Sequence, residues 1–174
     1  LYTISLVSEE TVDLNSDANH IAVSLISNVE DLEVDFGGAE DWISMTAVSD
    51  AFGKKIVEFD VVRSSEFKER TAVVTLGAAA TDDVVTVTVN QAQRDTAFVV
   101  GEQKIVKGLE ALSIDLVIKS NVDVTYSLPT WLSQTVTATT EKDETGLQSK
   151  SITLTADACG GSRSATISFR SSNQ

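Results

Sequence analysis

The sequence predicts an all-β protein made of two consecutive Ig-like β-sandwich domains. Two observations support this fold class: apolar and polar residues alternate along many short stretches, and the pattern occurs once in each half of the chain. Alternation with a period of two is typical of strands, because successive side chains of a strand point to opposite faces. No stretch of ten or more residues has the apolar spacing of a helix.

Six short stretches carry the alternation, and Val and Thr are frequent in them. β-branched side chains of this kind suit a pleated surface. Gly, Asn, Asp and Ser residues separate the stretches, as expected for turns between the strands of a sandwich or barrel. The stretches are residues 21–25, 32–36 and 85–89 in the first half and residues 112–118, 152–154 and 165–169 in the second.

The chain also contains an internal repeat, which indicates duplication of one domain. Three short motifs recur in the same order, at offsets of 89, 91 and 93 residues. Insertions and deletions in loops explain why the offsets differ slightly. The matched pairs are residues 42–44 with 131–133, residues 21–25 with 112–116, and residues 70–76 with 163–169.

The repeat predicts two domains, at residues 1–93 and residues 97–174, joined by a short connector. In the first repeat, a strand rich in Val and Thr (residues 84–90) follows the strand that begins at Arg70. No counterpart follows residues 163–169 in the second repeat. We therefore expect the second sandwich to lack its final strand and to present an open edge, which pairs with another chain or with the next part of a longer protein.

Composition limits the classes of partner. The formal net charge is −13, which disfavours nucleic acid, because that binding depends on Lys and Arg displacing counterions. It equally disfavours an anionic membrane surface. No apolar stretch approaches the roughly 20 residues of a membrane-spanning helix. The chain begins at Leu1 rather than Met, so we expect a mature or trimmed fragment whose export signal has been removed.

No catalytic set can be assembled from the sequence. The only histidine is His20, without the nucleophile and orienting acid of a catalytic triad, and we expect it to lie on the surface. The only cysteine is Cys159, which excludes an intrachain disulfide. Adjacent acids such as Asp82 and Asp83 point to opposite faces of a strand and lack the spacing of a calcium loop. The sequence therefore predicts no enzyme, no metal site and no cofactor.

Two Trp and two Arg residues occupy corresponding positions in the repeats. Trp42 corresponds to Trp131, and Arg70 corresponds to Arg163. Aromatic faces can stack on sugars, but residues that follow the fold repeat are better explained as packing anchors. We expect each Arg to bind loop carbonyl groups or an acid, since its guanidinium offers five donors. All four residues are thus predicted to be structural.

Phe52 and Phe67 do not follow the repeat and lie in loop-like stretches of the first half. They are the candidate residues for contact with a glycan. The alternative is that both cover one end of the sandwich, because single apolar residues are common on protein surfaces.

The order of these motifs resembles the BACON domain, a Bacteroidetes-associated module often found on the N-terminal side of carbohydrate-active proteins. In the first repeat the resemblance rests on Trp42-Ile43-Ser44, Phe59-Asp60-Val61, Arg70-Thr71-Ala72 and the Val-x-Gln-Ala end of the strand at residues 87–92. In the second repeat it rests on Trp131-Leu132-Ser133, Leu154-Thr155-Ala156 and Arg163-Ser164-Ala165, without the Val-x-Gln strand.

The resemblance implies an Ig-like sandwich, export to the periplasm or cell surface, as an outer-membrane lipoprotein or secreted protein, and binding of glycans such as mucin. It transfers no catalytic residue. Two functions remain open at this point. One is a carbohydrate-binding or cell-adhesion module. The other is a spacer that presents neighbouring domains of a longer surface protein.

Overall fold

The computed structural model describes residues 1–102, 105 and 107–172, and these residues contain strands but no helix. The predicted all-β class is therefore confirmed. No helix in this part of the chain is long and apolar enough to cross a membrane. The chain divides into two compact units, unit 1 (Leu1–Arg94) and unit 2 (Asp95–Gln174).

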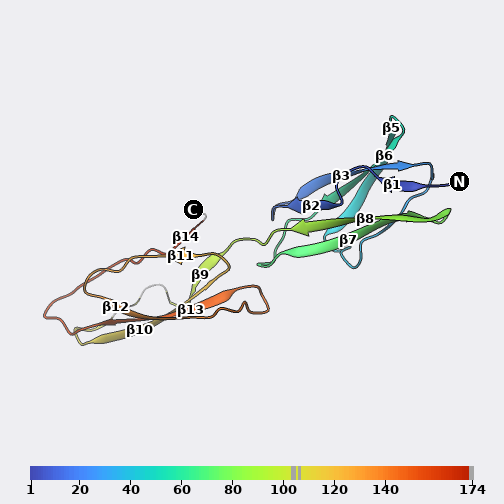
Figure 1. The fold of residues 1–174 in the computed structure, drawn as a ribbon. Coiled ribbons are helices and arrows are strands. Elements are labelled where there is room, and N and C mark those ends of the chain that lie inside the picture. Colours follow the sequence, from blue (N-terminus) through green and yellow to red (C-terminus); the bar gives the residue numbers. More distant parts are fainter. Residues whose placement is uncertain (103–104, 106, 173–174) are drawn as a thin grey trace. The chain divides into compact units, whose positions relative to one another are not determined.

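The first sheet of unit 1 has four antiparallel strands in the order β1-β3-β6-β5 (Figure 1). Strands β5 and β6 are consecutive in the chain and pair directly as a hairpin. A β-bulge between Met45 and Ala47 interrupts the register of β5 against β6. The strands are β1 (Ile4–Leu6), β3 (Asn19–Ser27), β5 (Ile43–Ala51) and β6 (Lys54–Val61).

The second sheet of unit 1 also has four strands, in the order β2-β8-β7-β4. Strand β2 runs parallel to β8, whereas the other pairs are antiparallel. The chain therefore starts in one sheet with β1 and crosses to the other with β2. The strands are β2 (Thr11–Leu14), β4 (Glu33–Asp35), β7 (Arg70–Ala78) and β8 (Thr81–Gln91).

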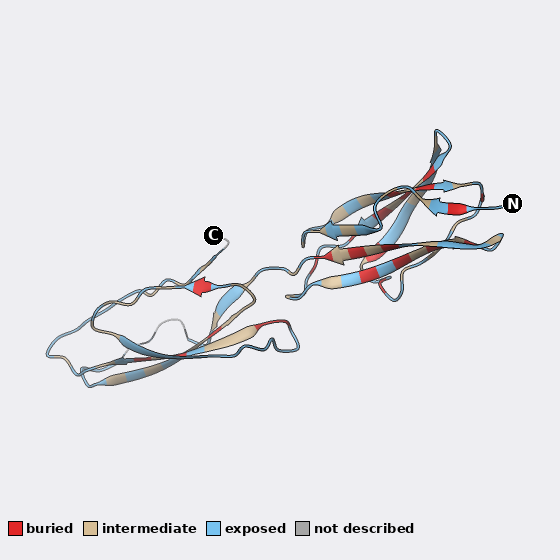
Figure 2. Cartoon of the chain, in the orientation of Figure 1, coloured by how far each residue is buried: buried red, intermediate tan, exposed pale blue. Residues whose placement is uncertain are grey.

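A single core fills the space between these two sheets. Phe59 of β6 and Leu76 of β7 are fully buried, and the ring of Phe36 meets that of Phe59 edge-on at 6.0 Å between centroids. Burial of one such side chain stabilises the fold by about 1.5–3 kcal/mol. Figure 2 shows buried positions recurring along β6, β7 and β8, as the alternation predicts for strands with one face inward.

Unit 2 repeats the first sheet of unit 1. Its strands follow the order β9-β10-β13-β12, which corresponds to β1-β3-β6-β5. Strand β10 pairs with β13 along its whole length, from Leu112 opposite Ala156 to Ser120 opposite Gln148. The strands are β9 (Ala97–Val100), β10 (Leu112–Ser120), β12 (Ser133–Ala138) and β13 (Gln148–Ala156).

In the part of unit 2 that the structure describes, the second sheet contains only β11 (Val124–Thr125) and β14 (Arg170–Ser171). Residues 163–169 correspond to most of β7 but form no strand, and no strand of the described residues takes the place of β8. The fully buried apolar core of the described part of unit 2 is small. It is centred on Ile118, Ile152 and Leu154, with Val124 opposite.

Candidate ligand-binding surface

Phe52 lies at the tip of the β5–β6 hairpin. Ala51 pairs with Lys54, so Phe52 and Gly53 form a two-residue turn, and both have positive φ (50° and 79°). Turns of this form favour Asn and Gly, and a bulky residue with positive φ is uncommon. The side chain of Phe52 is fully exposed, at 108%. The fold thus presents an aromatic ring to solvent at a position where a smaller residue would fit the backbone better.

Two further exposed hydrophobic residues lie at the same end of unit 1. In the antiparallel register, Ile4 of β1 pairs with Ser27, and Leu25 pairs with Lys55 at the start of β6. Tyr2, Ile26 and the turn at Phe52 therefore share one end of the first sheet. Tyr2 and Ile26 are each 52% exposed. The sequence analysis missed both residues, because only strand register brings them to the end where Phe52 lies.

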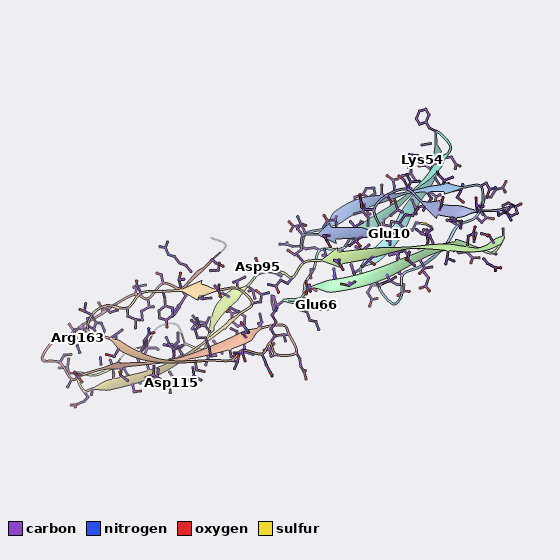
Figure 3. The ribbon with its side chains drawn as sticks, in the orientation of Figure 1. Glu10, Lys54, Glu66, Asp95, Asp115 and Arg163 are labelled. Carbon is purple, nitrogen blue, oxygen red and sulfur yellow. The ribbon has the colours of Figure 1, made fainter. Side chains whose placement is uncertain are left out.

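Charged side chains border this turn. The Nζ of Lys55 lies 3.1 Å from Oδ1 of Asp50 across the hairpin, with the lysine side chain largely buried and the aspartate exposed. Lys54 lies next to the turn (Figure 3). The end of unit 1 that carries Tyr2, Ile26 and Phe52, here called the hairpin end, thus combines apolar surface with hydrogen-bonding groups.

Phe67 lies elsewhere. It is half-buried in the segment between β6 and β7, which starts where β6 ends, whereas Phe52 precedes β6. An eight-residue strand spans roughly 26 Å. Figure 3 shows Glu66, the neighbour of Phe67 in sequence, and Lys54, near Phe52, at opposite ends of unit 1. The structure therefore does not bring the two candidate phenylalanines together.

Trp42 and Arg70 belong to a polar network at the Phe67 end of unit 1. The guanidinium carbon of Arg70 lies 4.4 Å from the Trp42 ring centroid. The Nε of Arg70 donates to Oε1 of Gln91 at 2.8 Å, and Nη2 donates to the carbonyl of Val62 at 2.8 Å. Gln91 is completely buried, and its Nε2 donates to the carbonyls of Asp17 (2.9 Å) and Val62 (3.2 Å).

Gln91 is thus the central residue of this network, which the sequence analysis did not single out. The only signal was its place in the Val-x-Gln-Ala ending of β8. Each polar atom of its side-chain amide has a partner, as a buried amide requires. The network ties β8 to the turn around Asp17 and to the segment after β6.

Unit 2 keeps the Trp–Arg stack but not the rest of the network. The guanidinium carbon of Arg163 lies 4.7 Å from the Trp131 ring centroid, and its Nη2 donates to the carbonyl of Asp157 at 2.7 Å. Cation–π contacts at exposed sites contribute about 0.5–1 kcal/mol. The described residues of unit 2 contain no buried amide in the position of Gln91.

A cavity of about 1340 Å³ occupies the interior of unit 2. Its walls come from both sheets, from described residues between β9 and β10, and from residues 163–169. Many wall residues are apolar: they include Ile114, Leu116, Leu154, Trp131, Ile167 and Phe169. In the part of the chain that the structure describes, no strand in the position of β8 lies along this cavity.

His20 lies on the outer face of the first sheet of unit 1 beside two acids. Its Nδ1 is 2.6 Å from Oδ1 of Asp60, and its Nε2 is 3.3 Å from Oε1 of Glu58. The hydrogen bond with Asp60, and then that with Glu58, raises the pKa of His20 above 6.5. The imidazole is therefore held toward its charged form by two carboxylates.

The described residues hold no group of three or more His, Cys, Asp or Glu side chains that could bind a metal ion. Cys159 is a half-exposed free thiol that donates to the carbonyl of Gly161, 2.9 Å away.

One family model matches part of this chain. Residues 32–92 match the family model described as "BACON: Putative binding domain, N-terminal". The match contains both Phe52 and Phe67 as well as the Trp42–Arg70–Gln91 network. The tandem arrangement stays a prediction, because the match does not reach unit 2.

No curated protein sequence matches the chain. Among solved structures, the chain is similar to a Bacteroides ovatus GH5 xyloglucanase in complex with a XXXG heptasaccharide, at 18% identity and a TM-score of 0.43. The alignment covers 52% of this chain and 19% of the xyloglucanase chain. Similarity at this level supports no inference about activity.

Proposed function

We propose that this chain is a non-catalytic binding or adhesion module of an exported, cell-surface or secreted protein, and that its ligand is carbohydrate, such as a glycan or mucin. The observation that carries the proposal is the fully exposed ring of Phe52 on a turn with positive φ. The match of residues 32–92 to a binding-domain family supports it.

Phe52 gives the fold no evident advantage. Its side chain is removed from the core, and its backbone conformation favours other residues, at a cost of order 1–3 kcal/mol. Strained backbone that presents a side chain to solvent is typical of ligand-binding positions. Aromatic faces contact the apolar C–H faces of sugars, and Asp50 and Lys54 beside the turn can bind hydroxyl groups.

The test uses Phe52→Asn and Phe52→Ala in the full chain, with native affinity electrophoresis in gels that contain gastric mucin or neutral plant polysaccharides. Asn suits positive φ, so Phe52→Asn keeps or raises the thermal stability while it removes the ring. We expect the wild-type protein to be retarded in at least one gel and both variants to lose at least about tenfold in affinity, roughly 1.4 kcal/mol.

Val62→Ala is the matched control, because Val62 is an exposed apolar residue that directly follows the other end of β6. It should bind as the wild type does. Equal binding by wild type and Phe52→Asn would contradict the role of Phe52. Tyr2→Ala and Ile26→Ala test whether the contact extends over the hairpin end.

The second candidate function is a spacer that presents neighbouring domains of a longer surface protein. The separation of Phe52 and Phe67 at opposite ends of β6 favours it, because no single face then gathers both candidate aromatics. If the wild-type protein shows no retardation with any of these polysaccharides, the spacer is the better explanation. Release of reducing sugar from a bound polysaccharide would contradict the non-catalytic assignment.

A further inference from the structure

The turn that presents Phe52 is followed directly by two lysines, which differ in their partners. The side chain of Lys55 is largely buried, and its Nζ lies 3.1 Å from Oδ1 of Asp50. Lys54 is exposed, and among the described residues no ion pair involves it. A chain of net charge −13 thus places one free ammonium group beside a fully exposed aromatic ring (Figure 3).

Strand register places Lys54 on the outer face of the first sheet. Leu25 pairs with Lys55 and is fully buried, so these two residues belong to the inner face. Their neighbours Ile26 and Lys54 therefore belong to the outer face, because successive side chains of a strand alternate. Ile26 is 52% exposed. An apolar side chain and a free ammonium group thus share one solvent-facing surface next to Phe52.

The first acid along this outer face of β6 is distant from Lys54. The next outward position is Ile56, whose partners in both neighbouring strands are serines. Glu58 follows, four residues from Lys54 and so roughly 13 Å along the strand, and its Oε1 lies 3.3 Å from Nε2 of His20. Charges are screened over about 8 Å in physiological salt. The outer face around Lys54 is therefore locally positive, although the whole chain is acidic.

The chemistry of an ammonium group selects the kind of ligand atom that it binds. It donates three hydrogen bonds and accepts none, and its bonds to anionic oxygens are about twice as strong as those to neutral groups. Ala51 pairs with Lys54 across the turn, at the roughly 4.5–5.5 Å between Cα atoms of antiparallel partners. Phe52 follows Ala51 directly, so the ring and the ammonium group can contact one ligand together.

We propose that the glycan bound at the hairpin end carries an anionic group, a carboxylate or a sulfate, and that Lys54 binds this group. The ring of Phe52 and the side chain of Ile26 contact apolar faces of the same glycan. This inference rests on the proposed carbohydrate-binding function and deepens it, because it names acidic glycans as the ligand class. Neutral polysaccharides lack the group that Lys54 binds and have a lower affinity.

An anionic membrane surface offers similar charged groups, but the charge of the chain disfavours it. One lysine near such a surface contributes only about 1 kcal/mol. A membrane would also bring many negative charges close to a chain of net charge −13, which repels them. A single acidic group on a flexible glycan meets only the locally positive surface around Lys54.

The test compares the full-length wild type with Lys54→Gln by native affinity electrophoresis. The gels contain gastric mucin that is untreated, treated with sialidase, chemically desulfated or treated in both ways, or a neutral galactomannan. We expect untreated mucin to retard the wild type most, and Lys54→Gln to weaken this binding about three- to tenfold, because one charge-assisted contact is lost. The difference should shrink when NaCl is raised from about 0.05 to about 0.5 M.

The two treatments identify the anionic group. A loss of wild-type affinity after sialidase assigns it to a carboxylate, and a loss after desulfation assigns it to a sulfate. On mucin that lacks the responsible group, the wild type and Lys54→Gln should bind equally.

Lys68→Gln is the matched control, because it removes the same charge from an exposed lysine in the segment between β6 and β7. It changes mobility in the gel as Lys54→Gln does, and should bind mucin as the wild type does. Lys54→Arg keeps the positive charge and should retain most of the affinity. The thermal unfolding midpoints of all three variants should match the wild type, because the altered side chains are exposed.

Equal binding of untreated mucin by the wild type and Lys54→Gln would overturn the acidic ligand. So would undiminished wild-type binding to mucin stripped of both sialic acid and sulfate. In either case a loss of binding in Phe52→Asn would leave the proposed function intact, whereas no retardation of the wild type in any gel would overturn both. Tighter binding to phosphatidylcholine vesicles that contain phosphatidylglycerol than to untreated mucin would assign the hairpin end to a lipid surface and overturn the glycan.

Discussion

Units 1 and 2 share one sheet and differ in the other. The order β1-β3-β6-β5 is repeated as β9-β10-β13-β12, and the Trp–Arg stack occurs in both units. Among the described residues, the second sheet has four strands in unit 1 and two in unit 2. The comparison shows that the first sheet keeps its strand pairing and register beside a smaller second sheet. It buries less apolar surface there, because fewer strands face it.

Burial is incomplete along β10 of unit 2. Ile118 is buried, whereas Leu112 and Ile114 are only half-buried, although Leu154, which pairs with Ile114, is buried. Hydrophobic stabilisation follows the apolar area removed from water. The same alternating sequence thus contributes less to stability in unit 2 than in unit 1.

The largest expected effect comes from truncation of matched core residues. Leu76→Ala removes a fully buried side chain and should destabilise unit 1 by about 2–5 kcal/mol. Phe169→Ala at the corresponding position removes a larger but half-exposed ring that packs on Tyr126, and should cost about 1–2 kcal/mol. Hydrogen exchange resolved by unit measures both values. A larger loss from Phe169→Ala would contradict the difference in cover between the units.

The next largest expected loss of stability distinguishes the Trp42–Arg70 site, which contains Gln91, from the Trp131–Arg163 site. Gln91→Ala leaves the carbonyl of Asp17 and the Nε of Arg70 without this partner, and should destabilise unit 1 by about 1–3 kcal/mol. Thr86→Ala on the exposed face of β8 is the control and should stay within ~0.5 kcal/mol of wild type. Denaturant unfolding with the tryptophan signal of a Trp131→Phe background measures unit 1. If Gln91→Ala left the free energy of unfolding of unit 1 unchanged, the network would not contribute to its stability.

The hairpin connections give a third contrast. Two residues join β5 to β6, but residues 139–147 join β12 to β13 and are organised by Asp143. Its Oδ1 accepts from Oγ1 of Thr145 (2.6 Å) and from the amide of Leu147 (3.1 Å), and its Oδ2 accepts from Nζ of Lys119 (2.9 Å). These hydrogen bonds, with that from Thr145 the largest cause, hold the pKa of Asp143 well below 3.8.

Asp143→Asn should therefore destabilise unit 2 at neutral pH. A carboxyl with a lowered pKa in the folded state contributes stability above its unfolded pKa of about 3.8, and loses it as the pH falls through the folded value. The difference between wild type and Asp143→Asn should narrow as the pH is lowered below about 3.8, in unfolding measurements from pH 7 downward. Glu141→Gln, an exposed acid in the same loop, should show no such pH dependence. If the stability difference between wild type and Asp143→Asn stayed constant as the pH fell, the lowered pKa of Asp143 would be contradicted.

The features that depend on the local sequence pattern could be predicted from the sequence. Alternation alone predicted the all-β class, since a strand's two faces can be read from neighbouring residues. It did not reach the role of Gln91, whose partner Asp17 lies 74 residues away. Nor did it place Tyr2 and Ile26 at the end of unit 1 where Phe52 lies, because that follows from non-local strand register. The positive φ of Phe52 was also hidden, since the Phe-Gly pair departs from the usual Asn-Gly signal.

The smallest expected effect concerns His20, which has no counterpart in unit 2, because it is the only histidine of the chain. Its single imidazole signal makes an NMR titration simple to assign. The pKa should exceed 6.5 in wild type and should fall in Asp60→Asn by more than in Glu58→Gln, because Asp60 makes the shorter contact.

The sign of the linked effect on stability follows from the raised pKa. A histidine with a raised pKa in the folded state adds stability that is full below its unfolded pKa of 6.5, and this is lost as the pH rises through the folded value. As the pH rises from 6.5 through the folded pKa, the stability of unit 1 should therefore decrease slightly more in wild type than in Asp60→Asn. The stability of unit 2 should show no such difference. A His20 pKa at or below 6.5 would show that the two carboxylates do not hold the imidazole charged.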